Sequence, residues 1–326
     1  MFAVDYLELE VSLATRPLGR TGTEVSVLGY GAMELRGIPR GPDIPDEQAG
    51  RVLHAVLDSG INLIDTSVDY GRSEELIGRY LHDRRDEFFL ASKCGCPLEV
   101  RPGMPVPYPH DYRAENVRAN VAQSLRRLRT DWIDLVQIHM SPSRAQLDQD
   151  DTVPTLLALR DEGKIRFLGM SGTLPHLREH IDMGVFDVFQ IPYSAVQREH
   201  EHLITAAANA RAGVLVRGGV ARGGPAEDKD WRQGPIGLPQ GEGMSRWQAA
   251  DLDDLLVGIS KMEFMLRFTL SHPQMSTAIV GTSNIAHLRD NLASAGKGPL
   301  PQDVYDEARR RLSQEIASES DKQRSG

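Results

Sequence analysis

The chain has 326 residues, of which 40% are hydrophobic and 25% are charged, a composition typical of a globular protein with one large domain or two smaller ones. Its formal net charge of −9 argues against sequence-independent binding to nucleic acid or to anionic membranes, because both require a positive surface. The sequence contains no apolar run near the roughly 18 residues of a membrane helix, and its first residues show no signal-peptide pattern. We therefore expect a cytoplasmic protein without nucleic-acid or membrane partners.

The chain has two cysteines, Cys94 and Cys96. A single Cys-x-Cys pair supplies neither a disulfide framework nor the four ligands of a structural zinc site. We expect two reduced thiols and no bound metal.

Short apolar segments alternate with amphipathic ones along the chain. The apolar segments predict strands at 25–30, 62–65, 88–92, 133–139, 165–171, 186–191, 213–217 and 276–280. The amphipathic segments predict helices at about 47–59, 72–82, 113–129, 151–162, 175–183, 199–212, 251–271, 284–294 and 301–317.

Repeated strand–helix units with buried strands form parallel sheets, and eight such units favour closure. The sequence therefore predicts the α/β class and a single (β/α)8 TIM barrel over residues 1–326. Residues 1–14 would be an N-terminal extension, the helix at 301–317 an extra C-terminal element, and residues 318–326 a disordered tail. The GxGxxG pattern of Rossmann folds fails after the first strand, because Glu34 stands where the third glycine belongs.

Two segments rich in glycine and proline, 94–112 and 218–243, interrupt this alternation. They predict long βα loops at the rim of an active site. For residues 226–240 an ordinary surface loop is an equal alternative.

Four chemically reactive residues lie at or just beyond the ends of three successive predicted strands: Asp65 and Tyr70, then Lys93, then His139. In a barrel, the carboxyl ends of the strands meet at one rim, where catalytic residues gather. Taken singly, each has a structural explanation, as a cap, a packed aromatic ring, a solvated strand end or a core histidine. Together they predict a catalytic site.

The chemistry of these four residues can be stated from their side chains. A phenol has a pKa near 10, and the adjacent Lys93 ammonium would lower the pKa of Tyr70 so that it acts as a general acid. Asp65 would pair with Lys93, and a neutral His139 would hydrogen-bond and orient a carbonyl oxygen. Hydride transfer would require a nicotinamide, because no side chain supplies a hydride.

The DxxxxYGxSE stretch from Asp65 to Glu74, together with Lys93 and His139, resembles the aldo-keto reductase family. The similarity runs from Arg16 to Asn291, and its first segment resembles the β-hairpin that plugs the bottom of those barrels. The resemblance implies reduction of a small aldehyde or ketone with Tyr70 as general acid. NADPH is the implied cofactor, NADH is an alternative, and the oligomeric state stays open.

The remaining strand ends are interpreted as contacts to the dinucleotide. By resemblance, Ser171 and Gln190 would hold the carboxamide, and the helix that follows Ser283 would favour phosphate at its N-terminus. The full predicted set is Gly31, Ala32, Met33, Asp65, Ser171, Gln190, Arg217, Gly218, Val220, Arg222, Gly281, Thr282, Ser283, His287, Asp290 and Asn291.

The sequence departs from the family pattern in three respects. Gly172 stands where many members have asparagine, and Arg217 where many have a tyrosine that stacks on the nicotinamide. Gly281 and His287 replace the lysine and arginine of many NADPH-preferring members, which leaves recognition of the 2′-phosphate open.

Two other functions were weighed against this one. A non-catalytic barrel subunit that binds nicotinamide and regulates or assembles with a partner is the alternative, which the intact set of four residues disfavours. A metal-assisted hydrolase would need more strand-end ligands than Asp65 and His139. Asp69, His82 and His110 are interpreted as structural or surface residues.

Overall fold

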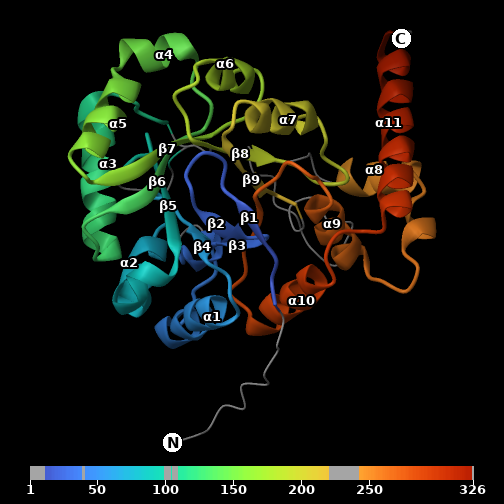
Figure 1. Cartoon of the computed structure of the whole chain (residues 1–326), viewed down its shortest axis with the longest axis horizontal. Helices are drawn as coiled ribbons and strands as arrows, with labels where there is room; N and C mark the ends of the chain where they lie inside the picture. The colour runs from blue at the N-terminus through green and yellow to red at the C-terminus, as the bar shows by residue number, and fades with distance from the viewer. Residues whose placement is uncertain (1–11, 39–40, 99–103, 105–108, 220–241, 325–326) are drawn as a thin grey trace, which may run out of the picture.

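A computed structural model describes residues 12–38, 41–98, 104, 109–219 and 242–324. Eight parallel strands form a closed barrel in the order β10-β3-β4-β5-β6-β7-β8-β9, with the helices around it (Figure 1). The strands are β3 (Leu28–Gly31), β4 (Leu63–Asp65), β5 (Phe89–Cys94), β6 (Ile133–His139), β7 (Ile165–Ser171), β8 (Val188–Pro192), β9 (Gly213–Arg217) and β10 (Thr277–Val280). The predicted (β/α)8 barrel is thus confirmed.

The helices cover the outer face of the barrel. They are α1 (Asp46–Asp58), α2 (Ser73–Leu81), α3 (Ala114–Leu128), α4 (Arg144–Gln149), α5 (Thr152–Asp161), α6 (Leu177–Asp182), α7 (Glu201–Asn209), α8 (Glu242–Ala249), α9 (Lys261–Leu270), α10 (Ile285–Gly296) and α11 (Gln302–Arg324). Short 3-10 helices are η1 (Ala32–Leu35), η2 (His82–Glu87) and η3 (Leu252–Leu255). No helix in the described parts of the chain is both long and apolar enough to cross a membrane.

The predicted strand at 25–30 is divided in the structure. Glu24–Ser26 forms β2, which pairs antiparallel with β1 (Thr15–Pro17), whereas the barrel strand begins at Leu28. The predicted N-terminal hairpin is therefore confirmed, and its second strand runs almost directly into the barrel.

The predicted helix at 251–271 is wrong as one continuous element. Its sequence forms η3 and then α9, with Gly258 at a φ of +73° between them. The Ser260 hydroxyl accepts a hydrogen bond from the Glu263 amide and so starts α9 anew. A similar cap by Ser143 starts α4, a helix that the sequence reading missed.

The C-terminal helix α11 stands beside the barrel, at the right of Figure 1. Its first turns bury Tyr305, Ala308 and Leu312. The helix continues to Arg324 through most of the segment predicted to be disordered; residues 302–325 contain no proline or glycine, so each added residue can gain a helical hydrogen bond. Residues 1–11 of the expected extension and residues 325–326 lie outside the described residues.

The barrel interior is a separate apolar cluster closed by the hairpin. Leu18 and Val25 from the hairpin region pack against inward-facing residues of the strands, namely Leu63, Phe89, Ala91, Leu135, Val188 and Leu215, with Phe167 and Ile279 against them. Side chains alternate along a strand, so the residue two positions further on points inward again, one layer higher. That next layer contains the predicted site.

Candidate active site

The layer above the apolar interior is polar. Two residues after Leu63 comes Asp65, two after Ala91 comes Lys93, and four after Leu135 comes His139. The Lys93 ammonium is buried and lies 2.7 Å from Asp65 Oδ2, and it also donates to the Thr66 carbonyl at 2.7 Å. Strand alternation thus brings the predicted pair together at the carboxyl ends of β4 and β5.

The second oxygen of Asp65 accepts hydrogen bonds from two glutamines. Gln137 Nε2 donates to Asp65 Oδ1 at 2.8 Å, and Gln190 Nε2 donates to the same oxygen at 2.9 Å. Ser171 Oγ in turn donates to Gln190 Oε1 at 3.0 Å. The two residues predicted to hold a carboxamide are therefore part of the network that fixes Lys93.

Burial and neighbouring charges together shift the pKa values of Lys93 and Tyr70. Burial is the largest single influence and would lower the pKa of Lys93, but the acidic groups around it, Asp65 foremost, together outweigh burial and the pKa is raised. Lys93 Nζ lies 4.7 Å from the centroid of the Tyr70 ring. Burial nevertheless raises the pKa of Tyr70, with Lys93 only opposing the rise, so the predicted lowering is wrong. The sequence could not show how completely the phenol is buried.

The loop that carries Tyr70 is held by its neighbours in the motif. Gly71 has a φ of +48°, and a Cβ there would lie 2.1 Å from the Arg36 carbonyl oxygen. Ser73 Oγ donates to the Ala32 carbonyl at 2.9 Å, and the buried Glu74 accepts from Ser92 Oγ at 2.8 Å. These residues position the loop.

His139 lies at the end of β6, with its ring edge-on to that of Tyr70 at a centroid distance of 6.2 Å. Burial lowers the pKa of His139 to about 3, so its ring is neutral at pH 7, as expected. Its Nδ1 lies 3.1 Å from Cys96 Sγ and 3.8 Å from Asp69 Oδ1. The contact with Cys96 leaves Nε2 as the other ring nitrogen for a substrate.

Sequence reasoning missed several residues of this site. Gln137 hydrogen-bonds Asp65. The sequence feature that could have identified it is a polar residue inside an otherwise apolar strand. Asp69, taken as structural or surface, is buried beside His139, and the His110 ring lies edge-on to His139 at 5.3 Å. Cys96 approaches His139 because the chain turns at Gly95 after β5, which spacing alone does not reveal.

The residues predicted to contact the dinucleotide follow β3, β9 and β10. Gly31 ends β3, and Ala32 and Met33 begin η1. Arg217 ends β9, where its positive charge contributes to the lowered pKa of His139, and Gly218 follows with a φ of +74°. Val220 and Arg222 lie outside the described residues.

The segment between β10 and α10 forms an exposed helix start. A Cβ at Gly281 would lie 2.7 Å from the Gly31 carbonyl oxygen, so β3 and β10 approach closely here. Asn284 caps α10 by accepting from the Ala286 amide at 2.9 Å. Thr282 is buried, Ser283 and Asn291 are half-buried, and His287 and Asp290 are exposed on the first turns.

The unusual Gly172 is explained by packing. A Cβ at this position would lie 3.0 Å from Leu177 Cδ1 and 3.2 Å from Ser141 Oγ. A side chain at this position would require the side chains of Leu177 and Ser141 to shift by a few tenths of an ångström.

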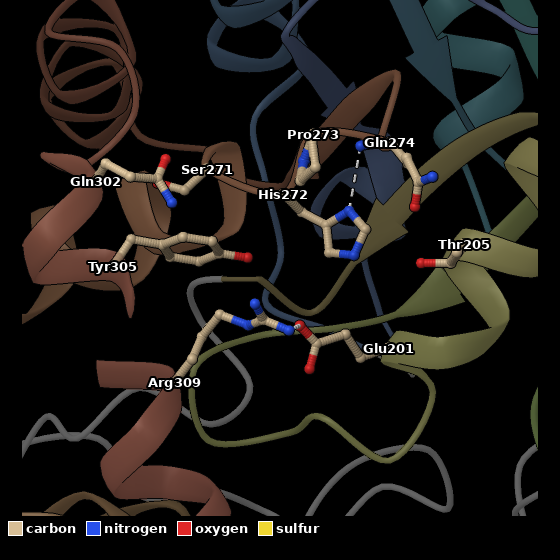
Figure 2. Close-up of a pocket in the computed structure, with 9 residues that line it drawn as sticks. All are labelled: Glu201, Thr205, Ser271, His272, Pro273, Gln274, Gln302, Tyr305 and Arg309. Carbon is tan, nitrogen blue, oxygen red and sulfur yellow. Dashed lines mark hydrogen bonds and ion pairs between the residues drawn. The ribbon is translucent and has the colours of Figure 1, made fainter. Parts of the chain in front are cut away.

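A different cavity of about 230 Å³ lies between α7, the loop before β10 and α11 (Figure 2). His272 projects into it, and Glu201 forms an ion pair with Arg309 at 2.9 Å across it. Its described lining includes none of the residues predicted to bind cofactor or substrate, so we separate it from the candidate active site.

The closed parallel barrel, with charged residues at the carboxyl ends of its strands, defines a TIM-barrel enzyme. The sequence model of the Aldo/keto reductase family matches residues 27–311. The chain belongs to this family, so it is an oxidoreductase from a family whose members use nicotinamide cofactors.

Three relatives illustrate the similarity. L-galactose dehydrogenase of Arabidopsis thaliana is 30% identical over 86% of this chain and 87% of its own length. An NADH-specific methylglyoxal reductase of Escherichia coli (strain K12) is 33% identical over 57% of this chain and 60% of its own length. The holo form of the aldo-keto reductase AKR11C1 from Bacillus halodurans superposes with a TM-score of 0.78 at 27% identity, covering 92% of this chain and 96% of that one.

Proposed function

We propose that the protein reduces a small aldehyde or ketone to the alcohol, with NADPH as cofactor and Tyr70 as general acid. The observation that carries the proposal is the convergence of Lys93, Asp65, Tyr70 and His139 above the barrel interior. Similarity to a methylglyoxal reductase and to a sugar dehydrogenase supports small polar carbonyl compounds as the substrate class.

The residues at the rim fit a nicotinamide dinucleotide. Ser171 and Gln190 place a hydroxyl and an amide next to Asp65, groups suited to a carboxamide. Among the described residues outside its immediate chain neighbours, the atom nearest to a Cβ built at Gly218 is Gln197 Oε1 at 3.9 Å, so these residues leave the backbone accessible. The exposed N-terminus of α10 offers amides and the positive end of a helix dipole to a phosphate. When bound, the nicotinamide supplies the hydride.

Tyr70 delivers the proton that completes the reduction. Its raised pKa keeps the phenol protonated at neutral pH, and the nearby Lys93 ammonium stabilises the phenolate that remains after donation. Asp65 holds Lys93 in place and charged. The neutral His139 donates a hydrogen bond from Nε2 to the carbonyl oxygen and directs it toward Tyr70.

The β10–α10 segment determines the cofactor preference in this proposal. His287 is exposed on the first turn of α10, where a positive or hydrogen-bonding group would meet a 2′-phosphate. Thr282 Oγ1 already accepts from the Asn284 amide at 3.0 Å, so its hydroxyl is less available. We therefore expect NADPH to be used with only modest discrimination against NADH.

A carbonyl panel with NADPH and with NADH, followed by cofactor absorbance, tests the proposal. We expect turnover of methylglyoxal or a small sugar aldehyde, and a loss of about 10²–10⁴ in kcat for Tyr70→Phe with cofactor binding retained. Tyr80→Phe, on α2, is the matched control and should keep wild-type activity. Full activity of Tyr70→Phe would show that Tyr70 is not the general acid. Cofactor binding without turnover of any carbonyl compound would instead indicate a non-catalytic cofactor-binding subunit.

A further inference from the structure

Three potential metal ligands gather beside the candidate active site. Cys96, His110 and His139 each offer one ligand atom, and these atoms all lie within 4.8 Å of one another. The sequence reading expected no metal, because the two cysteines alone were insufficient. We propose that these residues form an inhibitory binding site for a thiophilic cation of the Zn²⁺ or Cd²⁺ type. The inhibitory part rests on the proposed reductase function, whereas the binding part does not.

The distances are close to those of an occupied site. Zinc binds sulfur at about 2.3 Å and imidazole nitrogen at about 2.0–2.1 Å, so its tetrahedral ligands lie about 3.3–3.8 Å apart. Cys96 Sγ and His139 Nδ1 are 3.1 Å apart, and the His110 ring lies edge-on to that of His139 at 5.3 Å. The ligand atom of His110 lies within 4.8 Å of the other two, and a shift of its ring toward them would complete the three-ligand site.

The surrounding structure fixes the three ligands. Asn120 accepts from the Cys96 amide at 3.1 Å and donates to the Cys96 carbonyl at 3.1 Å. Tyr112 donates to the His139 carbonyl at 2.9 Å, and its ring stacks with that of His110 at 6.0 Å. Because Asn120 holds Cys96 and Tyr112 holds His139, two of the three ligands need little ordering on binding.

The local charges suit a divalent cation. Asp69 Oδ1 lies 3.8 Å from His139 Nδ1 and so places a carboxylate at the edge of the cluster. Binding would release the thiol proton of Cys96 to solvent and leave a thiolate on the metal. The thiolate and Asp69 would offset the two charges of the cation and Asp65 offsets Lys93, while the positive charge of Arg217 also acts on His139. His110 is half-buried, whereas Cys96 and His139 are buried.

The ligand set selects the type of metal and explains inhibition. A thiolate with two imidazoles favours Zn²⁺, Cd²⁺ or Cu⁺ over Mg²⁺ or Ca²⁺, which prefer oxygen ligands. A cation on His139 Nδ1 would reorient the ring that is proposed to direct the carbonyl, 6.2 Å from the Tyr70 ring. The ion would also bring positive charge next to the substrate site.

Cd²⁺ titration of the reduced full-length protein tests binding without any catalytic assay. We expect an ultraviolet thiolate-to-cadmium band that saturates at one equivalent, that is absent in Cys96→Ser, and that needs at least about tenfold more Cd²⁺ in His110→Gln. Cys94→Ser is the matched control, because Cys94 is equally buried but packs in the core outside the cluster. Circular dichroism establishes that each variant is folded.

Several results would overturn the site. They are a missing band in the wild-type protein, a band kept in folded Cys96→Ser, a band lost in Cys94→Ser, or unchanged affinity in His110→Gln. Zn²⁺ inhibition is then measured with the carbonyl substrate: we expect inhibition reversed by a chelator, and about tenfold weaker in His110→Gln. Cd²⁺ binding by a protein without reductase activity would uphold the site and reject only the proposed function, while binding without inhibition of an active enzyme would reject the inhibitory role.

Discussion

Gln190 donates a hydrogen bond to Asp65 at 2.9 Å, across 125 residues of sequence. Asp65 in the same geometry accepts from Lys93 on its other oxygen. A residue predicted to touch the cofactor and a residue predicted to support the acid are therefore coupled through one carboxylate. A substitution of either Gln190 or Asp65 should therefore alter the position of Lys93.

Asp65→Asn should reduce both activity and stability. An asparagine has one acceptor oxygen, so it cannot serve Lys93 and the two glutamine amides together, and a buried ammonium loses its counter-charge. Breaking a buried pair in this way costs about 3–5 kcal/mol. We expect urea unfolding to show this loss, with a fall in kcat/KM of at least about 100-fold.

The pH dependence of this loss follows from the raised pKa of Lys93. Stability from a raised amine pKa is complete below the unfolded value near 10.4 and is lost as pH rises beyond it toward the folded value. The stability difference between Asp65→Asn and wild type should therefore be constant from pH 7 to 9. Asp187→Asn, a buried aspartate paired with Arg20 before β8, is the control and should lose stability while kcat is kept. Equal kcat for Asp65→Asn and Asp187→Asn would contradict the assigned role.

Gly71→Ala should displace the loop that carries Tyr70. The added Cβ would meet the Arg36 carbonyl at 2.1 Å, in a backbone conformation with a φ of +48°. We expect a loss of about 1–3 kcal/mol in unfolding free energy and about 100-fold in kcat. Gly60→Ala places the same strain where nothing lies within 4 Å, so it should cost stability alone. Activity falling equally in both variants would argue against a positioning effect.

His272→Asn should reduce the loss of unfolding free energy that occurs as pH falls below neutral. Burial lowers the pKa of His272 from 6.5 to about 4. Between pH 6.5 and pH 4 this histidine is therefore protonated in the unfolded chain but neutral in the folded chain. Folding should therefore weaken as pH falls through this window, by about 3 kcal/mol from this residue. Asparagine retains an acceptor for the Gln274 amide in the cavity of Figure 2 but does not titrate.

Urea unfolding at pH 7 and at pH 4 measures this difference. The stability gap between wild type and His272→Asn should shrink or reverse at pH 4. The exposed His287→Gln serves as control and should keep the wild-type slope. An unchanged slope in His272→Asn would show that other groups dominate acid unfolding.

His287→Arg should increase the preference for NADPH. Residue 287 is exposed on the first turn of α10, where a guanidinium can pair with a 2′-phosphate. We expect the ratio of kcat/KM for NADPH to that for NADH to rise by about tenfold, equivalent to roughly 1.4 kcal/mol. His287→Glu should lower the same ratio by repulsion. Identical NADPH-to-NADH ratios of kcat/KM in the two variants would show that the 2′-phosphate does not bind near residue 287.

Much of this protein could be predicted from local pattern. Apolar strands alternating with amphipathic helices indicated the barrel, and all eight strands lie within a few residues of their predicted positions. The four proposed catalytic residues could be selected because each lies at or just beyond the carboxyl end of a strand, and these ends meet in a parallel barrel. Capping and turn residues were less visible, which is why Gly258 and Ser260 divided a helix that was predicted as continuous.

The sequence by itself determined the barrel, the placement of Asp65, Lys93 and His139 at strand ends, and the family. These features depend on the spacing of apolar residues and on a sequence motif. Only the tertiary structure decided that Gln137 binds Asp65, that Cys96 meets His139, and that burial outweighs Lys93 at Tyr70. The physical reason is that cross-strand contacts depend on the stagger of the closed sheet, and desolvation depends on every atom packed around a group. Neither quantity is encoded in a local run of residues.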